Sequence, residues 1–266
     1  MSKGVLSRVL RTGGATLPVP WPSLASKIEP EPGFVVSTIG APGVGKTLFA
    51  ATWAYRIELP SLYVSLDTDL RSQALRVVAM LRNLPVDEVK ANPDRFSAWL
   101  AKQQHPVRWS ASPISVDELD QLVLAETEFL GEVPSLVVID SVADLVREES
   151  YEEYVHVFAG LRKTAKKFKC VILALHHLKT GTEFDGTKRV SLNDTLFSGQ
   201  RQPEIVLGIW RPTPDDMRVG VLKNRMGAAD RLGGYYAELG CDMSRAQLSS
   251  YDQLEEYRRA MLGGKK

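Results

Sequence analysis

The stretch that decides the fold is "FVVSTIGAPGVGKT", Phe34 to Thr47. Its first half is a continuous apolar and β-branched run, which is typical of a strand buried on both faces of a parallel sheet. Its second half matches G-x-x-x-x-G-K-[ST], and we expect a helix to begin at Lys46. The three glycines allow the backbone to curl, so that successive N–H groups point at one centre. Because a helix N-terminus adds partial positive charge there, the stretch predicts a phosphate-binding loop.

This loop is expected to hold a nucleoside triphosphate, with ATP and Mg²⁺ as the cofactors. Lys46 would bridge the β- and γ-phosphates, and the Thr47 hydroxyl would ligate Mg²⁺. The expected nucleotide-binding residues of the loop and helix start are Gly40, Ala41, Pro42, Gly43, Val44, Gly45, Lys46, Thr47 and Leu48. A second stretch, "SLVVIDS", predicts a central strand that carries Asp140 to the C-terminal edge of the sheet, where ligands bind in open α/β sheets. Asp140 is therefore expected to hold Mg²⁺ through water.

Composition indicates one large globular domain. The chain has 266 residues, of which 44% are hydrophobic and 24% are charged. No apolar run approaches the roughly 18 to 20 residues of a membrane span, and the N-terminus has no signal-peptide pattern, so we expect a cytoplasmic protein. Cys170 and Cys241 form no metal-ligand pattern and are expected to be buried thiols. The net charge of +1 means that any DNA contact must be local.

The order of elements predicts an α/β fold. Strands such as "SLYVSL" and "CVILALH" alternate with helices expected at about 70–84, 116–130 and 152–169, which predicts a mostly parallel sheet flanked by helices. A polar stretch at 85–106 interrupts this order. Beyond residue 199, the runs "EIVLGIW", "MRVGVLK" and "GGYYAEL" have no helices between them, which predicts antiparallel hairpins that extend the sheet.

The motifs in their order along residues 34–240 resemble the RecA-like P-loop ATPases. They are the phosphate loop, "YVSLDTDLRSQALR", "LVVIDS", "ILALHHLKTG", "SGQRQPEIVLGIWRP" and "LKNRMG". The nearest resemblance is to the motor domain of DnaB-type replicative helicases in its small, single-domain, phage-type version. It implies a RecA-like fold and an ATP hydrolase that acts on single-stranded DNA.

The resemblance also implies a catalytic base. In that family the strand after the first helix ends in Ser-Leu-Glu, and the glutamate polarises the attacking water. This sequence has Ser65, Leu66 and Asp67, so the shorter Asp67 takes that role. Asp69 is the alternative base, and either aspartate could instead cap the following helix.

Two neighbouring histidines end the strand "CVILALH". His176 and His177 point to opposite faces of a strand. By resemblance, His177 stands where the family has a polar γ-phosphate sensor. The alternative is a histidine buried in the core. A zinc pair is disfavoured, because adjacent strand residues diverge.

A long polar segment, "KTGTEFDGTKRVSLNDTLFSGQ", follows and corresponds to the second DNA-binding loop of RecA-like proteins. Lys179, Lys188 and Arg189 are its expected phosphate contacts. The segment "VREESYEEY", residues 146–154, occupies the position of the first loop and is acidic, which would repel DNA.

"LKNRMG" carries two cations one residue apart. In DnaB-type ATPases a Lys-x-Arg at this hairpin reaches the nucleotide of the neighbouring subunit, so Lys223 and Arg225 are the expected catalytic cations, with Arg225 as the arginine finger. This implies a homo-oligomer with shared sites, expected to be a hexameric ring. Residues 210–212, "WRP", are expected to frame the adenine, with Arg211 as a contact; the alternative is a core Trp210 beside an exposed Arg211.

The expected division is an N-terminal arm at 1–33 that packs on a neighbouring subunit, a RecA-like ATPase domain at 34–245 and a helical tail at 246–266. "GVLSRVLR" is the one short helix expected in the arm.

Three functions stay open on the sequence. The first is a ring-shaped ATPase that binds or moves along single-stranded DNA in replication or recombination. The second is a filament-forming recombination or DNA-processing protein, with a nuclease version in which Asp67, Asp69 and Asp140 hold the metal. The third is a clock-type regulatory ATPase that binds no nucleic acid.

Overall fold

The described residues form one α/β unit built on a single sheet. The computed structural model describes residues 15–67, 69–179, 185–197 and 201–251. Among these residues the sheet has nine strands in the order β3-β2-β4-β5-β1-β6-β7-β8-β9. The strands are β1 (Val35–Gly40), β2 (Ser61–Ser65), β3 (Val107–Ser110), β4 (Leu136–Asp140), β5 (Val171–His176), β6 (Ile205–Thr213), β7 (Asp216–Asn224), β8 (Tyr236–Asp242) and β9 (Gln247–Ser250).

The sheet has a parallel part and an antiparallel part, as the sequence predicts. Strands β3, β2, β4, β5, β1 and β6 pair in parallel. Strands β6 to β9 pair antiparallel through successive hairpins. The register places Ser65 beside Asp140 and Ile39 beside His176, so the polar strand ends gather at one edge of the sheet.

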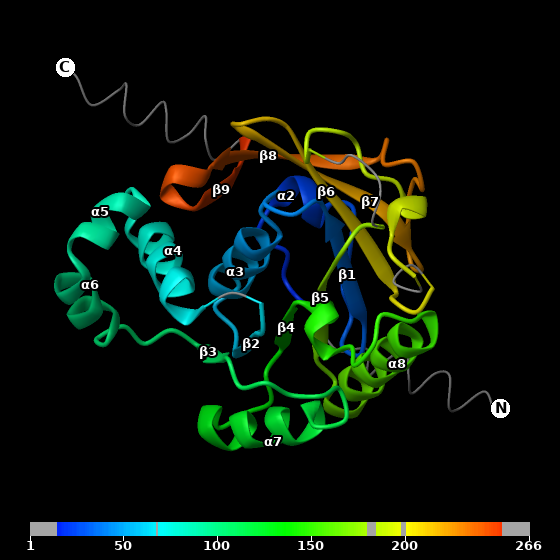
Figure 1. Ribbon diagram of the computed structural model, residues 1–266, viewed down its shortest axis with the longest axis horizontal. Helices are drawn as coiled ribbons and strands as arrows, with labels where there is room; N and C mark the ends of the chain where they lie inside the picture. The colour runs from blue at the N-terminus through cyan, green and yellow to red at the C-terminus, as the bar shows by residue number, and fades with distance from the viewer. Residues whose placement is uncertain (1–14, 68, 180–184, 198–200, 252–266) are drawn as a thin grey trace.

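Helices cover both faces of the sheet (Figure 1). The helices longer than four residues are α3 (Lys46–Arg56), α4 (Leu70–Arg82), α5 (Val86–Ala91), α6 (Pro93–Leu100), α7 (Leu119–Leu130) and α8 (Tyr151–Phe168). Helices α3 to α6 lie on one side, and α7 and α8 lie on the other. The described 3-10 turns are η1 (Val142–Leu145), η2 (Leu192–Asp194) and η3 (Met243–Arg245).

The ends of the helices follow local chemistry. Asp69 caps α4 by accepting the N–H of Ser72 at 2.9 Å, and Ser150 caps α8 by accepting the N–H of Glu153 at 3.2 Å. Glu152 and Glu153 lie in the first turn of α8, where acidic side chains stabilise the helix dipole. Part of the acidic segment expected as the first DNA loop is therefore the beginning of a helix.

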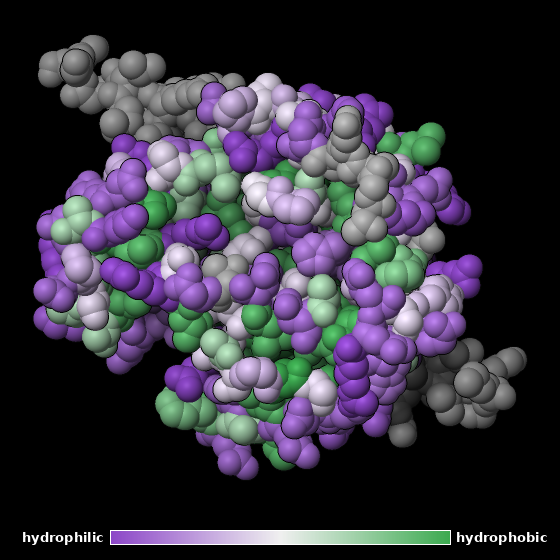
Figure 2. Space-filling model, viewed as in Figure 1, coloured by the Kyte–Doolittle hydropathy of each residue, from purple (hydrophilic) through white to green (hydrophobic). Residues whose placement is uncertain are grey.

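The core consists of apolar layers on the two faces of the sheet. Alternate residues of one strand divide between them: Val36 packs with α3 and α4, and Val35 packs with α7 and α8. Hydrophilic residues dominate the rim of the face in Figure 2, and hydrophobic ones show mainly between them. Cys170 and Cys241 are buried free thiols, as expected.

The described part of the expected arm packs on its own chain. Trp21, beside the short helix α2 (Pro22–Ala25), has no exposed surface and stacks on Phe49 of α3 with ring centroids 4.7 Å apart. The indole of Trp53 donates to the carbonyl of Pro18 at 2.8 Å. Docking on a neighbouring subunit therefore remains a prediction only for residues 1–14. Those residues, with the expected helix "GVLSRVLR", lie outside the described residues.

One segment has structure that the sequence did not predict, and one expectation needs correction. The polar stretch at 85–106 contains helices α5 and α6, which form because Val89 and Phe96 are buried against the core although each helix is short. Residues 247–250 were expected to begin a helical tail, but they form β9 because they pair with β8. Residues 252–266 lie outside the described residues. No helix of the described residues is long and apolar enough to cross a membrane.

Candidate functional site: a phosphate cradle and its facing carboxylates

The loop between β1 and α3 is curled as a phosphate cradle. Gly43 and Gly45 have φ of +73° and +108°, a conformation that side-chain-bearing residues rarely adopt. A Cβ on Gly40 would lie 2.8 Å from the carbonyl oxygen of Ile209, so only glycine fits between β1 and β6. Gly45 caps α3, and the N–H groups of the first turn of α3 are therefore open to an anion.

Lys46 is drawn back into the cradle. Its ammonium donates to the carbonyls of Gly40 at 2.8 Å and Ala41 at 3.1 Å, and its residue is 9% exposed. Burial lowers its pKa to about 8, although Asp140 and Asp67 oppose the shift. The Lys46 ammonium can exchange these neutral carbonyl acceptors for the negatively charged oxygens of a phosphate, which form stronger hydrogen bonds with it.

Asp140 ends β4 directly beside the cradle and is held from behind. Tyr63 of β2 donates its hydroxyl to Oδ2 of Asp140 at 2.8 Å, and Thr47 bonds the same carboxylate. Burial raises the pKa of Asp140, and nearby Asp67 raises it further, whereas the bonds from Tyr63 and Thr47 lower it. Burial, together with Asp140, raises the pKa of Tyr63 well above its usual value, so the phenol stays a donor.

The two candidate bases separate clearly. Asp67 is exposed in the hollow that also contains Lys46, Thr47 and Asp140, and its backbone N–H reaches the Asp140 carbonyl at 3.2 Å. Asp69 instead caps α4 and does not line that hollow. No group of three metal-binding side chains occurs among the described residues, so the three aspartates do not form the nuclease-type cluster considered above.

The two histidines also separate. His177 is partly buried in the same hollow, with Nε2 3.4 Å from the Ser141 hydroxyl, and its pKa is lowered by burial and then by Lys46. His176 is fully buried between Tyr154 and Phe158, and its Nε2 donates to the carbonyl of Leu196 at 2.9 Å. His176 is thus a core histidine, with a pKa lowered to about 4 by burial.

The hollow, of about 490 Å³, also contains residues that sequence reasoning missed: Arg76, Val86, Met243 and Ala246. Arg76 lies two helical turns into α4, and Met243 comes from the turn between β8 and β9. The position of Arg76 was an available signal. It lies seven residues after Asp69, the N-cap of α4, so helical periodicity places it on the same face as the beginning of the helix. Nothing in the sequence places the β8–β9 turn over Gly45, which is a long-range contact.

The donor set fits a magnesium–nucleotide complex. The Thr47 hydroxyl and the carboxylates of Asp140 and Asp67 are oxygen donors, which Mg²⁺ prefers. Because this set lacks a third carboxylate, it suits an ion that also takes oxygens from a bound phosphate and from water.

Residues 30–183 match the family described as AAA domain. The chain belongs to the AAA-domain family. It is 30% identical over 239 residues to the Gene 65 protein of Mycobacterium phage D29, a match that covers 82% of this chain and all of that protein. It is 28% identical over 250 residues to the Gene 65 protein of Mycobacterium phage L5, covering 86% of this chain and 90% of that protein.

Solved structures show where this AAA-domain chain belongs in fold space. It is similar to the ATPase domain of G40P with a TM-score of 0.77 and 17% identity, over 93% of this chain and 96% of that one. It is similar to a DnaB-like replicative helicase, solved with its interactions with primase, with a TM-score of 0.75 and 17% identity. That match covers 93% of this chain and 65% of the helicase. The fold is therefore that of DnaB-like ATPase domains, and the AAA-domain chain is an ATP-hydrolysing P-loop enzyme.

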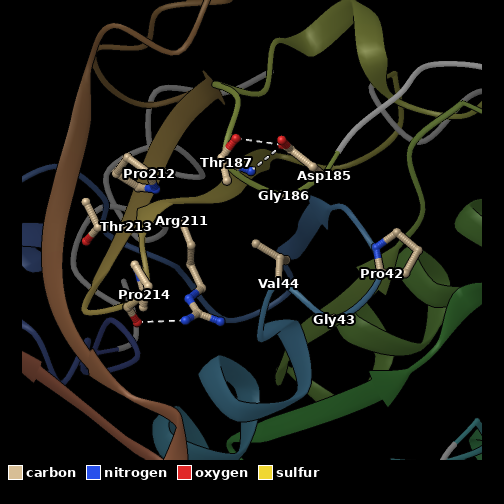
Figure 3. A pocket seen from close by; sticks show the side chains of 10 residues that line it. All are labelled: Pro42, Gly43, Val44, Asp185, Gly186, Thr187, Arg211, Pro212, Thr213 and Pro214. Atoms are coloured by element: carbon tan, nitrogen blue, oxygen red, sulfur yellow. Dashed lines mark hydrogen bonds between the residues drawn. The ribbon is translucent and has the colours of Figure 1, made fainter.

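A second hollow adjoins the cradle of the AAA domain (Figure 3). It is lined by Pro42 to Val44, Asp185 to Thr187 and Arg211 to Pro214. Arg211 lies beside Val44 and bonds the Pro214 carbonyl at 2.6 Å, so it is placed next to the cradle as expected. Trp210 does not lie next to the cradle, because it is 1% exposed and packs edge-on against Tyr236. Trp210 is therefore the core tryptophan of the alternative interpretation and does not frame the base, because strand alternation turns it into the core.

The expected DNA residues do not line either of the two hollows. Lys179, Lys188 and Arg189 are all exposed. Around them the described parts of the loop are anchored: Gly186 accepts the N–H of Arg211 at 2.7 Å, and Val190 is buried. Residues 180–184, which include Phe184, and residues 198–200 lie outside the described residues.

Lys223 and Arg225 lie at the end of the sheet opposite the cradle, where β1 begins. Asn224 pairs with Ile205, which pairs with Val36 at the beginning of β1, whereas the cradle follows the end of β1. At about 3.3 Å per residue, Arg225 lies roughly 16 Å along the strands from the cradle of its own chain.

Both cations have contacts in their own chain. Lys223 donates to the carbonyls of Arg201 at 2.9 Å and Pro203 at 2.6 Å, and burial lowers its pKa to about 8, with Arg225 adding to the shift. Arg225 lies 3.8 Å from the carboxylate of Glu204 with a side chain that is 42% exposed. Arg225 is the more accessible of the two.

Proposed function

We propose that this chain is a ring-forming ATPase that couples ATP hydrolysis to binding of, or movement along, single-stranded DNA, as the motor of a DnaB-like helicase. The likeness of the fold to DnaB-like ATPase domains supports this proposal. The observation that carries it is the position of Arg225, which is partly exposed and lies at the opposite end of the strands from the cradle of its own chain. An arginine there can complete only a site on another subunit.

The proposed chemistry assigns one role to each group in the hollow. Lys46 leaves its backbone carbonyls and binds the β- and γ-phosphates, while Thr47 and Asp140 hold Mg²⁺, which neutralises phosphate charge. Asp67 is exposed in the same hollow and orients the attacking water. His177, whose pKa is lowered by burial, bonds the γ-phosphate as a hydrogen-bond donor.

The neighbouring subunit supplies the remaining charge. Arg225 would place a planar guanidinium against the γ-phosphate, which is worth about 10³ to 10⁵ in rate for arginine fingers. Lys223 would support it as a point charge after giving up its carbonyl partners. Repetition of this head-to-tail contact closes a ring, for which we propose six subunits. Lys179, Lys188 and Arg189 would contact the DNA backbone, and Arg211 would lie against the base.

A subunit-mixing experiment tests the shared site. Lys46→Ala removes the cradle cation, Arg225→Ala removes the finger, and each variant alone should lack turnover. In a one-to-one mixture about a quarter of the contacts pair an intact cradle with an intact finger, so ATPase activity should return to about a quarter of wild type. Arg218→Ala is the matched control, because Arg218 lies on the same strand and pairs with Glu238 at 2.9 Å instead.

The DNA part is tested in the same assay. Turnover of the wild-type enzyme should rise when single-stranded DNA is added, and Lys188→Ala with Arg189→Ala should reduce that rise without changing basal turnover. If the mixture stays inactive, or if Arg225→Ala turns over ATP at the wild-type rate, the shared site is wrong. Absence of any DNA effect on rate or binding would remove the motor function while leaving the ring intact.

A further inference from the structure

A buried tyrosine stands behind the carboxylate of Asp140. Tyr63 is fully buried, and its hydroxyl donates to Oδ2 of Asp140 at 2.8 Å. In the register of β2 and β4, Tyr63 lies opposite Val138, so its long side chain reaches diagonally to the next residue on the same face, Asp140.

The ring of Tyr63 is itself fixed. It stacks on Trp109 of the edge strand β3 with centroids 4.0 Å apart and planes 20° apart. The indole N–H of Trp109 donates to the Tyr55 hydroxyl at 3.0 Å, and Tyr55 belongs to α3, the helix that begins in the cradle. The phenol is thus held between the sheet and the cradle helix, with its hydroxyl bonded to Oδ2 of Asp140 and 3.5 Å from the backbone carbonyl oxygen of Thr47.

We propose that Tyr63 is a positioning residue for the metal carboxylate: its hydroxyl holds Oδ2 of Asp140 so that Oδ1 faces the hollow. This inference rests on the proposed role of Asp140. Without the hydroxyl, the carboxylate would rotate about its last torsion and would lose a charge-assisted hydrogen bond in a buried place. Groups that orient a metal-binding residue in this way typically change metal affinity by 10- to 100-fold.

The matched pair Tyr63→Phe and Tyr55→Phe tests this. Each removes one hydroxyl from a tyrosine next to Trp109, but only the first hydroxyl touches Asp140. The measurements are Mn²⁺ affinity in the presence of ADP, by electron paramagnetic resonance of the bound ion, ADP affinity in EDTA, and the thermal midpoint. We expect Tyr63→Phe to weaken Mn²⁺ binding about tenfold or more and to leave ADP affinity in EDTA within about twofold.

The controls separate positioning from folding and from the proposed function. Tyr55→Phe leaves the Tyr63 hydroxyl and its stacking on Trp109 in place, so it should weaken Mn²⁺ binding much less than Tyr63→Phe does. Equal loss in both variants, or a loss in Tyr63→Phe that also appears in EDTA, would mean a structural role and would overturn the inference. Asp140→Asn should abolish the tight Mn²⁺ site. If it does not, the proposed metal role of Asp140 fails, whereas a normal Tyr63→Phe beside a defective Asp140→Asn overturns only the role of Tyr63.

Discussion

Nucleotide affinity should depend on pH through Lys46. In the free cradle its pKa is about 8, because burial outweighs the attraction of Asp140 and Asp67. Bound phosphates bring negative charge to the ammonium and favour its protonated form, so the pKa rises on binding. Nucleotide affinity should therefore fall as the pH rises through 8. Above that pH most of the free protein has lost the Lys46 proton, and binding must take up a proton from solution.

The magnitude comes directly from the pKa. With a value of about 8, about nine-tenths of the free chains carry the proton at pH 7 and about one-tenth at pH 9. The dissociation constant for ADP should therefore rise about tenfold between pH 7 and pH 9, a loss of about 1.4 kcal/mol. Calorimetry in two buffers of different ionisation enthalpy should show uptake of about 0.9 proton per ADP at pH 9 and about 0.1 at pH 7.

Two variants isolate the titrating group. Lys46→Arg keeps its charge throughout this range, so its affinity should be flat from pH 7 to pH 9 whatever its absolute value. Lys223 also has a pKa of about 8, but it lies at the other edge of the sheet, and Lys223→Gln should keep the wild-type slope in dilute protein. An ADP affinity that changes less than about twofold in wild type, or a slope that survives in Lys46→Arg, would refute the reasoning.

Two further predictions concern stability. Trp21→Ala should lower the free energy of unfolding in urea by about 3 to 5 kcal/mol, because a fully buried indole and its stacking on Phe49 are lost. The loss should not depend on protein concentration; a loss seen only in assembled protein would mean that the segment packs between subunits. Because His176 has a pKa of about 4 when folded and about 6.5 when unfolded, stability should fall as pH drops from 6.5 to 4, by up to about 1.2 kcal/mol per unit near the middle of that range, at about pH 5. His176→Gln, which keeps a donor for Leu196, should remove that part of the slope in acid unfolding curves, and an unchanged slope would contradict the assignment.

The parts of the fold that follow from sequence are those set by local pattern. The β-branched runs that became β1 and β4 are buried on both faces, and the glycines of the cradle are required by positive φ or by close packing. Asp140 was predictable for the same reason, because a polar residue that ends a buried strand lies at the edge of the sheet. Choosing between Asp67 and Asp69 needed the structure, since capping chemistry and catalysis favour the same residue type.

The parts that did not follow are long-range. Tyr63 meets Asp140 across 77 residues of sequence, and its stacking partner Trp109 comes from a third strand. Neither contact follows from a sequence period or a motif. Choosing between a base-framing and a core Trp210 also needed the structure, which buries this residue because a strand turns its neighbours to opposite faces. Short helices α5 and α6 form because of burial, which a polar composition conceals.

Strand β1 also fixes what kind of motion a shared site can use. Its last residue begins the cradle, and its first residue, Val35, donates its N–H to the carboxylate of Glu204 at 3.0 Å. Glu204 also forms an ion pair with Arg162 at 3.0 Å and lies 3.8 Å from Arg225, so the base of the finger is tied to the strand that carries the cradle. A buried central strand is among the least deformable parts of a domain. If Arg225 completes the site of a neighbouring subunit, closure of that site must therefore come from rotation of whole subunits rather than from bending within one subunit. The cradle and Arg225 of each subunit must then move together.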